Sequence, residues 1–274
     1  MRSRRSLLDD YMPSELQTRV WCGALAGPLF VFAFTVLGAR RSKYDWRRHT
    51  VSSLAAGHKG WLQRVNFVVA GLLYTNAARG LSRCSRQSVG PRAVPLLVAA
   101  AGIGLIGSGA FVTDPIGGFP PVAGAADGLN DAAPTRNAST REGTLHSLCA
   151  VPVFAGLPVA GLASAVAAAR RKDYGWACYS SLSSFVMVGA FVLMGRAFGG
   201  VPRLVGKGGI FQRISIASGV GWLTALSVRA QSSRPKHQAA PDRRVTSGRG
   251  RALRPTRGRQ ARQPPAVRRG VGVS

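Results

Sequence analysis

The chain has 274 residues, of which 46% are hydrophobic and 17% charged, and its formal net charge is +27. Those averages resemble a soluble protein, but they mix two unlike regions. Residues 20–228 alternate long uncharged stretches with short arginine-rich joints, whereas residues 231–274 hold twelve Lys or Arg and a single acid. The four cysteines show no CxxC spacing, so neither a zinc knuckle nor a redox dithiol is indicated.

Uncharged runs near 20 residues in length predict membrane-spanning helices, because crossing the ~30 Å hydrocarbon layer takes about 20 residues. Two runs, 65–78 and 214–228, are shorter, but flanking arginines can extend them by laying their stems along the helix. The predicted spans, in chain order, are approximately 20–38, 62–81, 93–112, 145–168, 174–195 and 210–228. The sequence therefore predicts an all-α membrane protein whose residues 20–229 form a six-transmembrane-helix bundle.

The regions flanking this bundle are polar. Residues 1–19 carry acids between the arginines and the first apolar run. We therefore expect the first predicted span to be a retained membrane anchor rather than a cleaved signal peptide. Residues 230–274 are rich in Arg, Pro and Gly and cannot bury enough apolar surface to fold, which predicts a disordered tail. We expect this tail to bind anionic phospholipids of the bilayer, and nucleic acid only without specificity.

The distribution of basic residues predicts the orientation. An even number of spans places both termini on one side, and 24 of the 37 Lys and Arg fall on that side, thirteen of them from Arg229 onward. Basic residues favour the cytoplasmic face. We therefore predict a multi-pass protein of the cell membrane with both termini in the cytoplasm.

Two motifs inside the predicted spans have structural explanations. Gly102, Gly104, Gly107 and Gly109 contain the GxGxxG pattern of dinucleotide-binding proteins, but they lie in an uncharged helix without the strand and turn that this pattern requires. Small residues that let helices approach closely explain them. A Gln-Arg pair enters both the second and the sixth predicted span, at positions 63–64 and 212–213, and we attribute this echo to chance.

One group of ionisable residues is predicted to lie at a common depth on the outer side of the membrane. It comprises His49, His58, Asp114 and His146. Such side chains can bind a divalent metal or act as general acid and base, with Ser52 or Ser53 as nucleophile. The segment between the first two histidines is too short to span and too apolar for an exposed loop, so we expect it to re-enter the interface. The alternative is that polar residues gather at helix ends because water is there.

Basic residues near this group, Arg47, Arg48, Lys59 and Arg64, would attract an anionic lipid headgroup. No charged residue lies near the middle of a predicted span, which disfavours an ion-coupled carrier. Three hypotheses therefore stand: a site that binds or acts on a lipid or other amphipathic anion, a non-catalytic scaffold or assembly subunit, and an uncoupled transporter. The sequence leaves open whether the protein is an enzyme.

The loop motifs resemble those of a family of prokaryotic membrane proteins, domain of unknown function 998. The matching segments are Tyr44-Asp45, Arg48 to Leu54, Gly60 to Phe67, Thr113 to Pro115, Gly118 to Pro121, Gly143 to His146 and Phe211 to Arg213. The chain departs from the pattern at Thr50, where proline is expected, and in its basic tail. The resemblance implies about six spans and a membrane location, without supplying a reaction.

Overall fold

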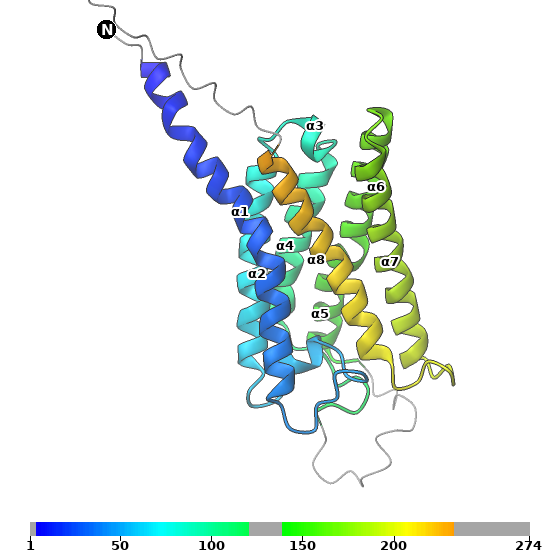
Figure 1. Ribbon diagram of the computed structural model, residues 1–274. Helices are drawn as coiled ribbons and strands as arrows, with labels where there is room; N and C mark the ends of the chain where they lie inside the picture. The colour runs from blue at the N-terminus through cyan, green and yellow to red at the C-terminus, as the bar shows by residue number, and fades with distance from the viewer. Residues whose placement is uncertain (1–3, 121–138, 233–274) are drawn as a thin grey trace, which may run out of the picture. The chain divides into compact units, whose positions relative to one another are not determined.

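The computed structural model describes residues 4–120 and 139–232, and within these ranges the chain forms helices and no strand (Figure 1). The long helical segments are α1 (Arg4–Ala39), α2 (Trp61–Leu81), α4 (Ala93–Ala110), the continuous α5 (Arg141–Val151), η3 (Pro152–Gly156) and α6 (Leu157–Arg170), α7 (Tyr174–Phe198) and α8 (Gly208–Ser232). Two short helices, η1 (Ser52–Ala55) and α3 (Arg86–Val89), lie in the joints. The predicted all-α class is confirmed. The predicted tail lies outside the described residues from position 233 onward.

Four of these segments are long and apolar enough to cross a membrane. They are Glu15–Ala39, Ala93–Ala110, Arg141–Arg170 and Tyr174–Phe198. Four of the six predicted spans therefore coincide with helices that could cross a membrane by their length and composition. α2 and α8 fall short because arginines and side-chain amides interrupt their apolar runs, as Arg64 and Arg79 do in α2.

Unlike in a soluble protein, large apolar side chains lie on the outer surface of the bundle as well as in its core. Large apolar side chains cover the outer surface, where Phe32 and Leu96 are each 69% exposed. Polar side chains are buried between the helices, and Gln63, Ser180 and Ser215 are 0% exposed. Polar groups turned inward and apolar groups turned outward suit a surface that faces lipid.

The helices close into a ring. α1 packs on α2, α2 on α4, and α4 on both α5 and α6; α6 then packs on α7, α7 on α8, and α8 returns to α1. Trp222 and Leu223 of α8 and Tyr74 of α2 are among the side chains buried inside this ring. The ring leaves each helix one face for its neighbours and one for the surroundings.

Glycines bring α4 close to two partners. A Cβ at Gly102 would lie 2.8 Å from the carbonyl oxygen of Gly71 in α2, and a Cβ at Gly107 would overlap the Cys149 sulfur in α5. The glycine motif thus serves helix packing on two sides of α4, as the sequence indicated.

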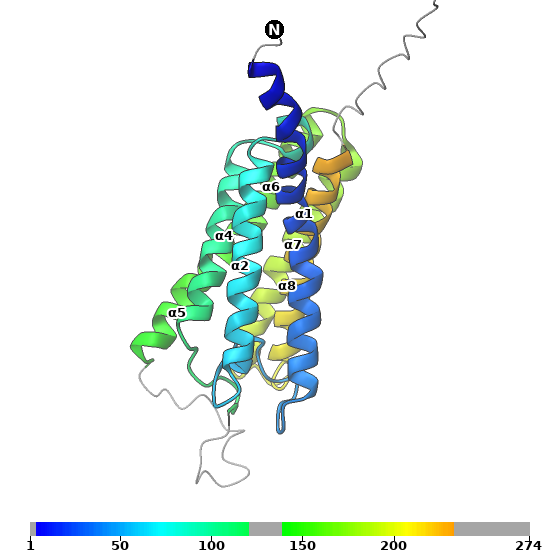
Figure 2. The ribbon, with the colours of Figure 1, turned by 90° about the vertical axis from the view of Figure 1, so that its left-hand side faces the viewer.

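The helix that begins at Arg141 is bent in its middle. Pro152 and Pro158 lack the backbone N–H that a regular helix requires, and the turn between them widens into the π-helix η3. Below this turn, α5 leans outward from its neighbours (Figure 2). The bend separates the lower half of this segment from α7.

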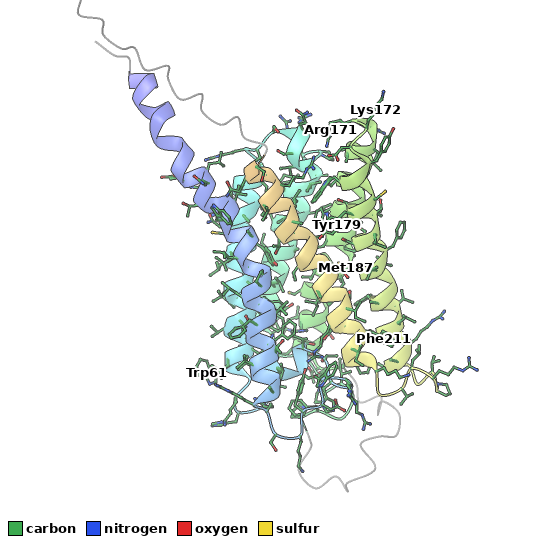
Figure 3. All side chains as sticks on the ribbon, in the orientation of Figure 1. Trp61, Arg171, Lys172, Tyr179, Met187 and Phe211 are labelled. Atoms are coloured by element: carbon green, nitrogen blue, oxygen red, sulfur yellow. The ribbon has the colours of Figure 1, made fainter. Side chains whose placement is uncertain are left out.

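The joints form two layers at opposite ends of the bundle. Residues 40–60 and 111–120 lie at one end, near Trp61 and Phe211, and we call them the loop layer (Figure 3). The joint that holds α3 lies at the other end with Arg171 and Lys172 (Figure 3). Most of the sequence-predicted site residues fall in or beside the loop layer.

Candidate functional site

The segment around η1 is folded into the end of the bundle. Its residues from His49 to Ala56 are buried except for Ser52, which is half-buried. The Val51 N–H donates to the Gln212 side-chain oxygen of α8 at 2.6 Å. A buried backbone donor needs a partner, so this bond fixes the depth of the segment. The segment is therefore buried in the end of the bundle and held there by a side chain from α8.

Both serines proposed as nucleophiles are bonded to Thr50. The hydroxyl oxygens of Thr50 and Ser53 lie 2.6 Å apart, and the Ser53 N–H donates to the Thr50 hydroxyl at 3.1 Å. The Ser52 hydroxyl donates to the same oxygen at 3.2 Å. Thr50, which stands where the family pattern has proline, thus bonds to both serines through one hydroxyl group and closes the first turn of η1.

His49 is held on every side. Its Nδ1 accepts the Asp45 N–H at 2.9 Å, and the ring is also hydrogen-bonded to the Gly117 backbone. Its ring stacks on Phe119 with centroids 5.1 Å apart. Burial lowers the pKa of His49, while the nearby Asp45 carboxylate acts in the opposite direction. The neutral imidazole therefore joins two loops, with neither nitrogen left for a ligand.

Arg213 of α8 fastens the same loop. Its guanidinium donates to the carbonyl oxygens of Trp46 and His49 at 2.8 and 3.1 Å, and to the Tyr44 hydroxyl at 2.6 Å.

Arg64 of α2 acts in the same way on α4, donating to the Gly109 and Ala110 carbonyls at 2.9 and 3.0 Å. These carbonyls end α4 and have no helical partner.

The two Gln-Arg pairs therefore share one arrangement. In each, the glutamine is buried, with Gln63 at 0% and Gln212 at 6% exposure, and the arginine bonds to carbonyls of a neighbouring segment. The echo that we attributed to chance thus has a common structural task. It also means that Arg64, expected to attract a headgroup, is committed to the end of α4.

Asp114 bonds to Thr140, the residue that caps the helix carrying His146. Its carboxylate accepts the Thr140 N–H at 3.1 Å and the Thr140 hydroxyl at 2.6 Å, and it lies against Gly143. A carboxylate at a helix N-terminus is stabilised by the helix dipole. Asp114 thus ties the loop after α4 to the start of α5.

His146 is buried in the wall of a cavity at this end of the bundle. Its Nδ1 lies 3.0 Å from the Phe111 carbonyl oxygen, which can only accept, so Nδ1 carries the proton. Its ring meets Phe67 edge-on at 6.1 Å. Of the four ionisable residues predicted to converge, only His146 lines the cavity.

The structure does not gather these four into one centre. His58 is exposed, His49 is enclosed in its loop, and Asp114 lies at the start of α5. Within residues 4–120 and 139–232, no three His, Cys, Asp or Glu side chains lie close enough to hold a metal ion. A common depth in the membrane placed them at one end but did not bring them into contact.

The other predicted headgroup residues lie at the surface of the loop layer. Lys59 and Arg47 are exposed, and Arg48 is half-buried. The Arg47 guanidinium lies over the Trp46 ring at 5.4 Å from its centroid. These three residues give the loop layer a basic surface.

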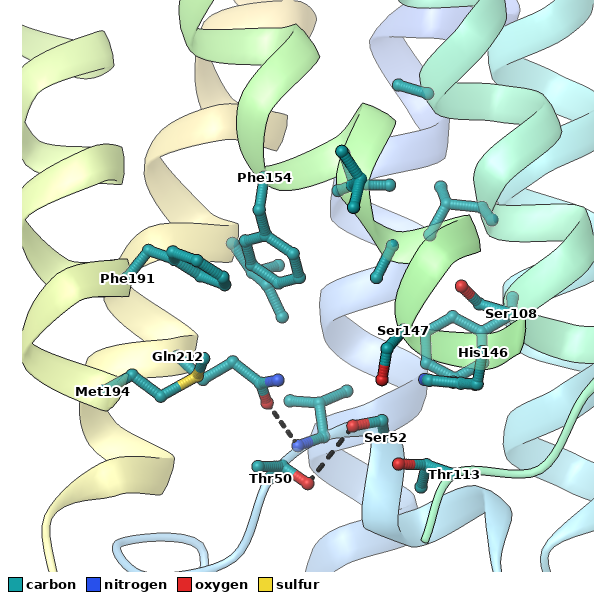
Figure 4. Close-up of a pocket in the computed structure, with 18 of the residues that line it drawn as sticks. Thr50, Ser52, Ser108, Thr113, His146, Ser147, Phe154, Phe191, Met194 and Gln212 are labelled. Atoms are coloured by element: carbon teal, nitrogen blue, oxygen red, sulfur yellow. Dashed lines mark hydrogen bonds between the residues drawn. The ribbon is translucent and has the colours of Figure 1, made fainter. Parts of the chain in front are cut away.

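The cavity beside His146, called here the end cavity, has a volume of about 230 Å³ (Figure 4). Its apolar wall comes from six helical segments and includes Phe30, Phe67, Tyr74, Leu105, Val153, Phe154, Leu157, Met187, Phe191, Met194, Phe198, Ile216 and Val220. Its polar edge is formed by Thr50, Ser52, Ser108, Thr113, His146, Ser147 and Gln212. The end cavity is therefore amphipathic.

Within the described ranges, the Gln212 amide is bonded through only one of its two polar atoms. Its oxygen is used by Val51, whereas its nitrogen donates to no residue in the described part of the chain and faces the end cavity (Figure 4). The buried Tyr74 hydroxyl also lacks a partner among the described residues. Sequence reasoning missed Gln212, and its only signal was the repeated Gln-Arg pair.

A ring of helices with inward polar groups, outward apolar groups and spans of membrane length defines an integral membrane protein. The chain belongs to the family described as protein of unknown function (DUF998), whose profile matches residues 24–229. The resemblance seen in the loop motifs is thereby confirmed. No curated protein and no solved structure matches the chain significantly.

Proposed function

We propose that this protein is a six-span protein of the cell membrane that binds a lipid or another amphipathic anion in the end cavity. The observation that carries the proposal is the cavity's division into an apolar wall and a polar edge, with an amide nitrogen left to donate. Ligand sites are concave, mostly apolar and supplied with a few placed polar groups.

The size of the end cavity supports an apolar chain or ring. Its volume of about 230 Å³ exceeds the roughly 150 Å³ of an engineered apolar cavity that binds benzene. Burial of each methylene group contributes about 0.8 kcal/mol and micromolar binding corresponds to about 8 kcal/mol, so about ten buried methylene groups are needed if the acyl chain alone supplies it, and fewer if the polar end is also held.

The exposure of lining residues supports entry from the side. Val151 on α5 is 54% exposed and Phe191 on α7 is 37% exposed, and Ser147 is exposed as well. These residues line the cavity and also reach the outer surface, so an acyl chain enters between α5 and α7 from the lipid. Arg47, Arg48 and Lys59 then attract the anionic end at the loop layer.

The packing of α2 and α8 supports the six-span count. Their polar residues are turned into the ring, where Gln63, Ser215 and Ser227 are each 0% exposed. With 21 and 25 residues these helices have the length of spans. The Lys and Arg distribution supports cytoplasmic termini, which places the end cavity at the outer face.

The bonding of the ionisable residues favours binding over catalysis. His49 and Asp114 hold loops, and the Ser52 and Ser53 hydroxyls are bonded to Thr50. A nucleophile needs a base within hydrogen-bond reach, and these contacts supply none to either serine. The second candidate is a non-catalytic scaffold or assembly subunit, in which these residues only hold the loops in place.

Filling the end cavity tests the proposal. Ala150 lines the cavity, so Ala150→Phe should displace a bound chain and weaken binding of a fluorescent fatty acid by about tenfold, equal to about 1.4 kcal/mol. The matched control is Ala217→Phe, which adds the same ring at an exposed site of α8 that does not line the cavity.

Binding is measured by fluorescence titration of the purified full-length protein. Chemical analysis of the lipid recovered after incubation shows whether it was altered. Equal weakening by both variants, or by neither, would falsify the cavity as the binding site. A hydrolysed or modified lipid would reject the binding role in favour of an enzyme.

A further inference from the structure

A second hollow, called here the basic groove, lies at the end of the bundle opposite the loop layer. It has a volume of about 580 Å³ and runs between the end of α2 and the start of α4. Its walls include Leu96, Ala99 and Ile103 of α4, and its rim carries Arg79, Arg86 and Arg92. None of these residues lines the end cavity.

The rim arginines come from three different elements. Arg79 lies in the last turn of α2, Arg86 begins α3, and Arg92 directly precedes α4. All three are exposed, and none of their guanidinium groups has an ion pair or hydrogen bond within the described residues. The chain from position 79 to 92 contains no acid. Three unneutralised positive charges therefore face one hollow.

The groove changes character along α4. Its apolar part is formed by α4, where Leu96 and Ile103 are 69% and 61% exposed. This helix is long and apolar enough to span a membrane. At its outer end lie the arginines and the N-terminus of α4, which carries a partial positive charge. Apolar walls that lead to a positive rim match an acyl chain that leads to a phosphate.

We propose that the basic groove binds an anionic phospholipid of the bilayer, with the headgroup phosphate at the three arginines and an acyl chain along the exposed face of α4. Basic pockets between membrane helices are suited to such headgroups. The arginine fork pairs with two phosphate oxygens at once. This site goes beyond the function proposed above, because it shares no residue with the end cavity.

The groove is tested with a triple variant, Arg79→Gln, Arg86→Gln and Arg92→Gln, of the full-length protein in detergent. Titration with phosphatidylglycerol, followed by native mass spectrometry, should show its affinity reduced about a hundredfold, because each of the three basic residues contributes about a fivefold factor. Phosphatidylcholine should bind weakly to both proteins. Thermal unfolding midpoints confirm that the variant is folded.

The matched control removes three positive charges from the same end of the bundle. Arg170, Arg171 and Lys172 are exposed in the joint between α6 and α7 and do not line the groove. Their replacement by Gln should change phosphatidylglycerol affinity by less than about threefold. Equal losses in the two triple variants would overturn the proposal, because general attraction to the basic chain would then explain binding.

A further variant separates a lipid site from a site for phosphate alone. Ala99→Trp fills the apolar part of the groove and leaves the arginines in place. It should weaken phosphatidylglycerol binding by about tenfold, and inorganic phosphate should compete poorly with the lipid. If phosphate displaces the lipid readily and Ala99→Trp has no effect, the groove binds a soluble anion and the lipid assignment is wrong.

Discussion

Alanine at Gly102 would place a methyl group between α4 and α2. The added Cβ would lie 2.6 Å from the Thr75 hydroxyl oxygen and 2.8 Å from both the Gly71 carbonyl oxygen and the Thr75 nitrogen. Two of these atoms belong to the backbone, so relief requires the helices to separate. Overpacking of this kind costs about 1–3 kcal/mol. In lipid the loss is felt directly, since close packing supplies much of the attraction between helices.

The matched control for this change is Gly189→Ala in α7, where an added Cβ meets no atom within 4 Å. Both substitutions gain the same helix propensity, about 1 kcal/mol, so the difference between the two variants isolates the packing cost. Reversible unfolding in mixed micelles should show Gly102→Ala less stable than Gly189→Ala by about 1–3 kcal/mol. Equal stability would refute the close approach of α2 and α4.

Three further changes test the loop layer and the path of the chain. Burial lowers the pKa of His49, so as the pH falls the unfolded chain takes up a proton at this residue before the folded protein does. The thermal unfolding midpoint should therefore fall as the pH drops below about 6.5, and His49→Asn should reduce this dependence. Parallel pH profiles of the two proteins would contradict the proposed role of His49. Gly143→Ala should lower the free energy of unfolding by about 1–3 kcal/mol, because the added methyl group overlaps the Asp114 carboxylate. Adding Asp114→Ala should reduce that loss, whereas additive losses in the double variant would contradict the contact. In a protein without native cysteines, the exposed positions Lys59→Cys and Lys172→Cys should react with an impermeant maleimide from opposite sides of the membrane; reaction from one side would exclude the six-span path.

Hydropathy located the helices because lipid imposes a simple rule on sequence. A chain that crosses the hydrocarbon layer must satisfy its backbone internally and keep charges out of the middle. The same rule does not predict where a helix begins or ends outside the hydrocarbon layer. α1 therefore begins at Arg4 and α5 at Arg141, earlier than the uncharged runs suggested.

The sequence indicates at which end of the bundle the site residues lie, but not which residues their side chains face. Distance along a helix from its end indicates the layer in which a residue lies, and His49, Asp114 and His146 do lie at one end of the bundle. Rotation about the helix axis and the course of the loops depend on packing between distant segments. Only the fold reveals that Asp114 faces Thr140 and that His49 faces Asp45.

Gln212 illustrates the same limit from the opposite direction. In the sequence it is a polar residue near the start of a weak span. In the structure it holds Val51 from 161 positions away and turns its amide toward the end cavity. A hydrogen bond between such distant residues has no periodicity, so the repeated Gln-Arg pair is its only trace in the sequence.

Photolabelling with a phospholipid that carries a diazirine at the end of one acyl chain tests the central claim most directly. After irradiation of the protein in membranes, peptide mass spectrometry locates the modified side chains. Occupancy of the end cavity predicts saturable labelling of buried lining residues such as Leu157 and Met187, both under 4% exposed. Labelling confined to outward residues such as Phe32 and Phe185, and not saturable, would contradict it.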